Sequence, residues 1–460
     1  MRKDSRLIVV ANRLPVQRVG RGSSARWERS SGGLVTAMSP ILRRHAGVWI
    51  GWTGNAGRAP APFTHERLMI RPIGLSEREV HDYYQGFCNR TIWPLFHDAL
   101  RPPEFQRDRW DCYIEINRRF ARAAARSARR GDIIWVHDYQ LLLAPRMIRE
   151  LRRDIKIGFF LHIPFPPEEL FAWLPWRQAV VRGLLGADLV GFQTFSDAQN
   201  FSRAARRYAP AEGTDTEITC ENRRIRINAF PISIDFRDFE RRANQSAVVQ
   251  RARQIRQRIG PERRIMLAVD RLDYTKGIES RLRAFEDLLE RKLIRVEDCV
   301  LIQIAVPSRE NVTEYQEMRM RIEQTVGRIN GEFSQPGHVA VHYFRRSVTP
   351  DDLSAYYRAA DVMLVTPLRD GMNLVAKEYV ATRTDYSGVL VLSEFAGAAR
   401  ELRRALLVNP HDIQGVAATI LQALRLPRDE ARKRMMILRM IVRRHDVYDW
   451  AEKFLEALER

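Results

Sequence analysis

Short apolar runs alternate with longer amphipathic stretches along the whole chain. The runs are rich in β-branched and bulky residues, as strands that helices cover on both faces require. They predict strands over residues 7–11, 48–52, 133–136, 157–161, 189–192, 265–269, 300–305, 339–344, 362–365, 389–392 and 406–408. The clearest helical stretches between them are 116–130 and the apolar stripe from 282 to 293. This alternation predicts an α/β fold with two sheets.

The chain is predicted to form two similar α/β domains with a cleft between them. A strand-like exit over 228–232, which contains a proline, is followed by the highly charged segment 241–264. We therefore assign residues 1–237 to an N-terminal domain and 238–445 to a C-terminal domain. Residues 446–460 predict an amphipathic helix that could pack on either domain, including back on the first. Ligands of such folds bind at the carboxyl ends of the strands.

The composition of the chain is strongly basic. The 460 residues include 76 basic and 56 acidic side chains, a net charge of +20, and only seven of the basic residues are lysines. Such an excess of positive charge suggests a nucleic acid or an acidic membrane as a binding partner. No nucleic-acid motif is present, and no stretch has the 18–20 apolar residues of a membrane span. The four cysteines form no CxxC pair, so we expect a cytoplasmic protein with reduced thiols and no bound metal.

Polar clusters follow several of the predicted strands in the first half. One is Asn12 to Pro15, followed by the pair Gly32-Gly33, which could present backbone N–H groups to a phosphate or simply form a flexible turn. Asp138 follows another strand and could orient a sugar hydroxyl or cap the next helix. His162 lies at a strand end before a proline-rich turn, where a binding role and a structural role are equally supported.

Two clusters in the second half point to a nucleotide-sugar. Arg271 and Lys276 lie on one loop next to a glycine, where two cations could stabilise a departing diphosphate; the alternative is a pair of surface salt bridges. Residues 366–378 follow the strand 362–365, and 371–374 are predicted to open a helix whose N-terminus favours a phosphate. Glu378, near the second turn, could accept the hydroxyls of a ribose. Neither GxGxxG nor GxxxxGK[ST] is present.

Taken together, these strings resemble the trehalose-6-phosphate synthase family, retaining glycosyltransferases of family 20 with the two-Rossmann-domain (GT-B) fold. The strings that carry the resemblance are Asn12-Arg13-Leu14-Pro15, Ser31-Gly32-Gly33-Leu34, Tyr83-Tyr84 with Asn89 and Trp93, His137-Asp138-Tyr139, the stretch 158–166, Asp270 through Gly277, Pro307-Ser308-Arg309, and Thr366 through Glu378. They occur in order across almost the whole chain.

The resemblance implies a role for each matching residue. The acceptor glucose 6-phosphate would be bound by Arg13, Tyr84, Trp93, Asp138 and Arg309. The donor would be bound by Gly33, His162, Arg271, Lys276, Asp370, Gly371, Met372, Asn373, Leu374 and Glu378. Asp138, His162, Arg271 and Lys276 would be catalytic. The resemblance implies no cofactor and no metal, because the nucleotide-sugar is itself a substrate.

The expected reaction moves glucose from a nucleotide-glucose to glucose 6-phosphate with retention, giving α,α-trehalose 6-phosphate. UDP-glucose is the favoured donor, although the loop 344–350 leaves uridine, guanosine and adenosine open. Alternatives are a related pseudo-glycosyltransferase, a glucosylglycerol-phosphate synthase or a non-catalytic sugar-phosphate sensor. The partners are then small molecules, without nucleic acid or membrane, and the sequence leaves a homo-oligomer open.

Overall fold

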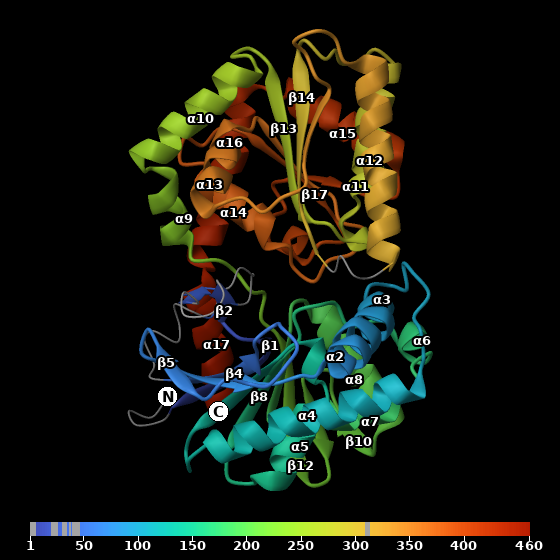
Figure 1. The fold of residues 1–460 in the computed structure, drawn as a ribbon, viewed down its shortest axis with the longest axis vertical. Coiled ribbons are helices and arrows are strands. Elements are labelled where there is room, and N and C mark those ends of the chain that lie inside the picture. The colour runs from blue at the N-terminus through green and yellow to red at the C-terminus, as the bar shows by residue number, and fades with distance from the viewer. Residues whose placement is uncertain (1–5, 20–25, 30–34, 36–37, 39–46, 309–312) are drawn as a thin grey trace. The chain divides into compact units, whose positions relative to one another are not determined.

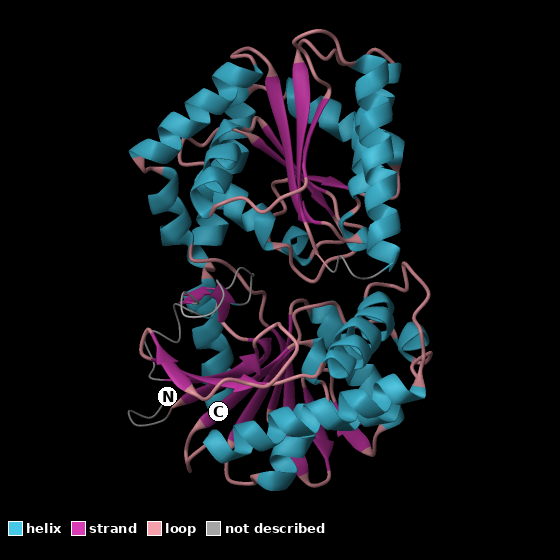
Figure 2. Ribbon diagram, viewed as in Figure 1, coloured by secondary structure: helices cyan, strands magenta, loops and turns pink. Residues whose placement is uncertain are grey.

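The chain forms two compact units (Figures 1 and 2). The computed structural model describes residues 6–19, 26–29, 35, 38, 47–308 and 313–460. Unit 1 comprises Met1–Ile232 together with Val447–Arg460, and unit 2 comprises Ser233–Asp446. The sequence placed the first boundary at residue 237 rather than 232. Ile232 is still tied to unit 1, where its N–H donates to the Gln193 side chain at 3.0 Å. The chain passes to unit 2 before residue 237, because the helix that begins at Phe236 packs on helices of that unit.

Unit 1 is built on a mixed sheet with a parallel centre. Its spatial order is β10 (Ala211–Gly213), β11 (Glu217–Cys220), β12 (Arg223–Ala229), β9 (Leu189–Phe192), β8 (Lys156–Phe160), β7 (Ile133–His137), β1 (Leu7–Arg13), β4 (Gly47–Trp52), β6 (Leu68–Ile73) and β5 (Phe63–His65). The strands from β12 to β6 pair in parallel, and β10, β11 and β5 add antiparallel edges. A separate ribbon pairs β2 (Val16–Val19) with β3 (Arg26–Arg29). The predicted strands are the central ones, since only these are apolar on both faces.

The helices of unit 1 pack on this sheet and on one another. They are α2 (Glu77–Glu79), η2 (Val80–Ile92), α3 (Trp93–Phe96), α4 (Arg107–Ser127), η3 (Tyr139–Leu141), α5 (Ala144–Leu151), α6 (Glu168–Phe171), α7 (Arg177–Leu184), α8 (Phe195–Tyr208) and α17 (Val447–Glu459). Helix α4 begins nine residues before the predicted start at 116, because Trp110 and Tyr113 continue its buried stripe. The C-terminal helix α17 packs on β8 and β9, so the end of the chain belongs to unit 1 (Figure 1).

Unit 2 has a wholly parallel sheet of six strands in the described residues. The spatial order is β15 (Val341–Phe344), β14 (Cys299–Val306), β13 (Arg264–Arg271), β16 (Val362–Val365), β17 (Val389–Ser393) and β18 (Leu406–Val408). Numbered within unit 2, this is the 3-2-1-4-5-6 order of a Rossmann fold. The order reverses between β13 and β16, and such a switch point is where ligands bind.

Helices cover both faces of the unit 2 sheet (Figure 2). They are α9 (Phe236–Ala243), α10 (Ser246–Ile259), η4 (Tyr274–Lys276), α11 (Ile278–Glu290), α12 (Thr313–Phe333), α13 (Pro350–Ala359), α14 (Leu374–Thr382), η5 (Gly397–Arg400), α15 (Ile413–Arg425) and α16 (Arg428–Arg444). The predicted stripe of residues 282–293 lies in α11 as far as Glu290, and Leu282, Phe285 and Leu288 are fully buried there; Leu293 follows the end of the helix. The α/β class with Rossmann-like domains is confirmed. Within the described residues, no helix has the length and apolar character needed to cross a membrane.

Candidate active site

The two polar loops predicted in unit 2 lie at its switch point. The β13 loop (residues 270–277) follows β13, and the β16 loop (residues 366–374) follows β16. The loops touch through their backbones, because the N–H of Leu368 donates to the carbonyl of Thr275 at 2.7 Å. Gly277 has φ +64°, and a Cβ added there would lie 2.3 Å from the carbonyl oxygen of Thr366. Only glycine allows this approach, so the sequence joins the two loops at that residue.

An ion pair between side chains also connects the two loops. Lys276 Nζ lies 2.6 Å from Asp370 Oδ2, and both side chains are largely buried. The side-chain amide of Asn373 donates to the same carboxylate oxygen at 3.1 Å. Arg271 ends β13 with an exposed side chain. Seven of the predicted donor residues thus lie on two adjoining loops. The pair Lys276–Asp370 puts a cation and a hydrogen-bond acceptor side by side.

The β16 loop leads into the N-terminus of α14, as predicted. Asn373 caps the helix in a left-handed conformation, and its side chain accepts from the N–H of Ala376. Gly371 lies against Gly397. A Cβ added at Gly397 would come within 1.9 Å of the Gly371 carbonyl oxygen. A backbone hydrogen bond fixes Met372, because its carbonyl accepts from the N–H of Ala398 at 2.9 Å. Residues 371–374 therefore present the first turn of α14, including Leu374, as a backbone surface that suits an anion.

Glu378 lies in the second turn of α14, as predicted, and is partly buried. Burial raises the pKa of this carboxyl group above its usual value, although the hydroxyl of Tyr357 donates to it at 2.9 Å and acts in the opposite direction. A carboxylate with one oxygen still available is a suitable acceptor for sugar hydroxyls.

A buried arginine that the sequence analysis did not single out supports both loops. Arg281 on α11 is fully buried and pairs with Asp270 at 2.6 Å. Its guanidinium also donates to Gln303 at 2.8 Å, Thr366 at 3.0 Å and the carbonyl of Lys276 at 3.1 Å. One side chain thus holds the start of each loop. Its position within an amphipathic helix gave no signal of this role, since arginines on helices are usually solvated.

In unit 1, Arg13 is the last residue of β1, and its guanidinium stacks on two aromatic rings. Its guanidinium lies 4.4 Å from the ring centre of Trp52 and 5.5 Å from that of Tyr84. Gly54 lies beneath it, with φ +96° and room for no Cβ, because an added one would come within 1.5 Å of Arg13 Nη1. Stacking on rings restrains a guanidinium while its N–H groups stay free to bind a phosphate. Trp52 was predicted only as the end of the strand 48–52, and Gly54 was not predicted to have a role.

Trp93 and Tyr84 belong to one hydrogen-bonded aromatic group. Tyr84 lies in η2, a π-helix that runs directly into α3, where Trp93 is buried. The side chain of Asn89 donates to the Tyr84 carbonyl at 2.7 Å and accepts from the hydroxyl of Tyr139 at 2.9 Å. The ring of Tyr139 contacts that of Trp93. The π-helical turn brings these residues together, and such turns are frequent at functional sites.

Asp138 and His162 lie together at the carboxyl ends of β7 and β8. Asp138 has φ +76°, an uncommon conformation for a residue with a side chain. Its carboxylate accepts from the backbone N–H of His162 at 3.2 Å and makes no capping bond to η3, which contradicts the capping alternative. Nε2 of His162 lies 3.1 Å from Nδ1 of His137, and burial lowers the pKa of His162 to about 3. His162 is therefore neutral at physiological pH.

Comparison with known proteins identifies the family. The model described as glycosyltransferase family 20 matches residues 5–460. The chain belongs to glycosyltransferase family 20. It is 53% identical to the trehalose-6-phosphate synthase of Mycolicibacterium smegmatis, over 99% of this chain and 92% of that relative. It is 52% identical to the same-named protein of Mycobacterium avium, over 99% of this chain and 95% of that relative.

Solved structures agree with this assignment. The UDP-forming α,α-trehalose-phosphate synthase of Burkholderia xenovorans, solved in complex with glucose-6-phosphate, is 34% identical, with a TM-score of 0.91 over 99% of this chain and 100% of that one. An E. coli structure named for trehalose-6-phosphate, solved with bound UDP-2-fluoro glucose, is 35% identical, with a TM-score of 0.91 over 99% of each chain. The similarity of this family 20 chain to both confirms the predicted fold class.

Two residues predicted for the family 20 site lie outside the described residues. These are Gly33, expected at the donor phosphates, and Arg309, expected at the acceptor phosphate. Their roles stay predictions. Within the described residues, no group of three His, Cys, Asp or Glu side chains could hold a metal ion.

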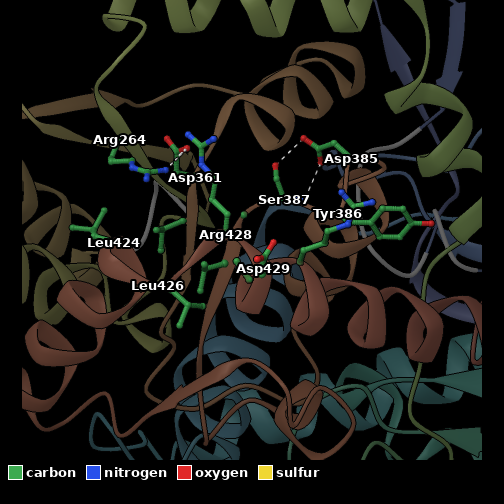
Figure 3. A pocket seen from close by; sticks show the side chains of 15 residues that line it. Arg264, Asp361, Asp385, Tyr386, Ser387, Leu424, Leu426, Arg428 and Asp429 are labelled. Atoms are coloured by element: carbon green, nitrogen blue, oxygen red, sulfur yellow. Dashed lines mark hydrogen bonds and ion pairs between the residues drawn. The ribbon is translucent and has the colours of Figure 1, made fainter.

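A cavity in unit 2 lies away from the family 20 loops. It has a volume of about 480 Å³ and lies at the amino ends of β13, β16 and β17, the opposite edge of the sheet from the two loops (Figure 3). Arginine and aspartate side chains line it together: Arg264 pairs with Asp361 at 3.4 Å, and Ser387 donates to Asp385 at 2.8 Å. Because the charges are mixed and partly paired, the cavity does not indicate one class of ligand.

Proposed function

We propose that the chain transfers glucose from UDP-glucose to the anomeric hydroxyl of glucose 6-phosphate, giving α,α-trehalose 6-phosphate and UDP. The observation that carries the proposal is the Lys276–Asp370 pair at the switch point of unit 2, beside the N-terminus of α14. A cation and a helix N-terminus together suit a sugar diphosphate. The relatives' names and the ligands named with the solved structures support the same substrates.

The chemistry breaks the bond between the glucose anomeric carbon and the diphosphate oxygen. Negative charge develops on that oxygen as the bond breaks, and we assign Arg271, Lys276 and the 371–374 backbone to stabilise it. The cations supply the positive charge that a divalent metal would otherwise provide, so we propose a reaction without metal or other cofactor. The acceptor oxygen attacks from the face that the diphosphate leaves, and the departing phosphate takes the acceptor proton, which retains the configuration.

Asp370 and Glu378 complete the proposed donor site. With Lys276 drawn to the diphosphate, the Asp370 carboxylate becomes available to accept from a donor sugar hydroxyl. Glu378 accepts from the ribose. Asp370 is held in place by Asn373, whose amide donates to it at 3.1 Å.

The acceptor is assigned to unit 1. Arg13, held against Trp52 and Tyr84, offers its guanidinium N–H groups to the acceptor phosphate. Asp138 keeps one carboxylate oxygen on the His162 backbone, and we propose that it also accepts from a sugar hydroxyl. Trp93 provides an aromatic wall. The four cysteines are free, consistent with a cytoplasmic location.

A donor panel tests the proposal. The protein is incubated with glucose 6-phosphate and UDP-, GDP- or ADP-glucose, and nucleoside diphosphate release and the sugar product are measured. We expect trehalose 6-phosphate, most rapidly from UDP-glucose. Glycerol 3-phosphate replaces the acceptor in a parallel reaction, because a glucosylglycerol-phosphate synthase would prefer it. No sugar product with any donor would refute the proposal.

Replacement of the assigned cation tests the mechanism. Lys276→Met should lower turnover by about two to three decades, the usual effect of removing a group that stabilises transition-state charge. Lys433→Met is the matched control, because Lys433 is exposed on α16. Near-normal turnover in Lys276→Met would show that the diphosphate is stabilised elsewhere. Added EDTA should leave the wild-type rate unchanged if no metal takes part.

A further inference from the structure

His137 and His162 form a hydrogen-bonded pair on the face of the unit 1 sheet that α17 covers. His137 ends β7 and pairs in register with Phe160 of β8, and His162 follows two residues later. The two rings stack with centres 5.4 Å apart. His137 is fully buried, whereas His162 is partly exposed. Only the outer ring can therefore meet a ligand.

The hydrogen bond between the two rings needs a proton on only one of the two nitrogens that form it. His137 Nδ1 and His162 Nε2 are 3.1 Å apart, so one donates and the other accepts. Burial lowers the pKa of both imidazoles, that of His137 well below its usual value, so both rings are neutral. Each neutral ring carries one N–H, which leaves two arrangements. Either His137 donates and His162 carries its proton on Nδ1, or His162 donates and carries it on Nε2.

The inner nitrogen of His137 decides between the two arrangements. His137 Nε2 is buried and has no hydrogen-bond partner among the described residues. If His162 donated, His137 would carry its proton on Nε2, and a buried N–H would be left without an acceptor. Buried N–H groups without a partner are rarer in proteins than under-satisfied acceptors. The arrangement in which His137 donates from Nδ1 leaves a bare nitrogen at that place instead.

The helix α17 holds the inner ring in this environment. Phe454 stacks on Trp135 with ring centres 4.3 Å apart, and Trp135 in turn contacts His137. Gly158 and Gly191 make room for Phe454, since a Cβ added at either would lie 2.7 Å from its ring. The inner ring therefore lies in a tightly packed aromatic cluster.

We propose that His137 is a positioning residue that fixes His162 as the tautomer with its proton on Nδ1. His162 then presents an N–H donor, rather than a lone pair, on its exposed side, where no described residue bonds Nδ1. The oxygen that it meets is a substrate hydroxyl, and this part alone rests on the proposed function. The backbone of His162 is fixed independently by its bond to Asp138.

The tautomer can be read directly in the free protein. Imidazole ¹⁵N labelling and long-range ¹H–¹⁵N spectra distinguish protonated from bare ring nitrogens in each of the ten histidines. The single variants His137→Phe and His162→Gln assign the two signals of interest. We expect Nδ1–H on both rings between pH 6 and 8. A spectrum with Nε2–H on His162 would overturn the proposal, whatever the enzyme's activity, so this failure is distinct from failure of the proposed function.

Two substitutions separate positioning from packing. His137→Phe keeps an aromatic ring in the cluster but has no N–H. His137→Asn loses the ring but places an amide N–H near the position of Nδ1. If His137 only packs, Phe should be the better replacement.

The proposal predicts the reverse order. His137→Asn should keep the Nδ1–H tautomer of His162 and a kcat within about threefold of wild type. His137→Phe should lose the tautomer preference and about tenfold in kcat, with the KM for glucose 6-phosphate unchanged. Wild-type kcat in His137→Phe together with a lower kcat in His137→Asn would overturn the proposal. If neither variant folds, the wild-type spectrum alone decides.

Discussion

Arg281→Met tests how the two donor loops are supported. The substitution removes a fully buried guanidinium while keeping a chain of similar length, so the packing of α11 changes little. It leaves the Asp270 carboxylate buried with one remaining side-chain donor, the Gln303 amide at 3.3 Å. Removal of one partner of a buried ion pair costs about 3–5 kcal/mol, because the other charge stays uncompensated.

A second substitution shows which part of this cost is charge. In the double variant Arg281→Met/Asp270→Asn the uncompensated charge is removed. The remaining cost, which the single variant shares, is that of the acceptors that lose Arg281, about 1–3 kcal/mol for each group left unsatisfied. The double variant should therefore be more stable than Arg281→Met by about 2 kcal/mol. Asp270→Asn alone should also be destabilising, because Arg281 then lacks its counter-charge.

Thermal unfolding measures these differences. Unit 2 spans residues 233–446, and for a domain of that size each kcal/mol shifts Tm by about 2–4 °C. The transition of unit 2 should fall by about 6–20 °C in Arg281→Met and recover in part in the double variant. Arg283→Met is the control, because Arg283 lies on the exposed side of the same helix. A double variant no more stable than Arg281→Met would refute the reasoning that uncompensated charge dominates.

Three further predictions concern two glycines near the site and the stability of unit 1 at low pH. Gly54→Ala should raise the KM for glucose 6-phosphate without changing that for the donor, because its Cβ displaces Arg13. Gly57 also has a positive φ but open space around the position of a Cβ, so Gly57→Ala should leave both values unchanged. Gly397→Ala should raise the KM for the donor, since its Cβ would come within 1.9 Å of a carbonyl oxygen of the β16 loop. The folded-state pKa of His162 is about 3 against 6.5 in the unfolded chain, which therefore binds more protons between these values. Unit 1 should lose stability as pH falls below about 6.5, and His162→Asn should make the loss of Tm shallower.

The central strands and the donor loops could be predicted because local sequence determines them. Val362–Val365 and Leu189–Phe192 are continuous apolar runs, and the structure has strands with the same bounds. The start of α14 followed from the loop pattern before it. Strands such as β12 were missed because arginines alternate with their apolar residues, which gives no continuous run.

The supporting residues of the site could not be predicted from local sequence. Trp52 lies 39 positions from Arg13, and Arg281 reaches Thr366 across 85 positions, so both contacts arise only from the order of the strands. His137 was part of a recognised string, but its bond to His162 depends on the register of β7 and β8. Pairing across a sheet is a non-local property, and composition or periodicity carries no information about it.

The reaction proposed for this chain is glucosyl transfer, with retention, to the anomeric hydroxyl of glucose 6-phosphate. The most direct measurement uses UDP-glucose labelled with ¹³C at C1 and follows the reaction with glucose 6-phosphate by NMR. We expect one labelled product, α,α-trehalose 6-phosphate, formed in equal amount with UDP. Labelled free glucose, a β-linked product or unchanged donor would contradict it.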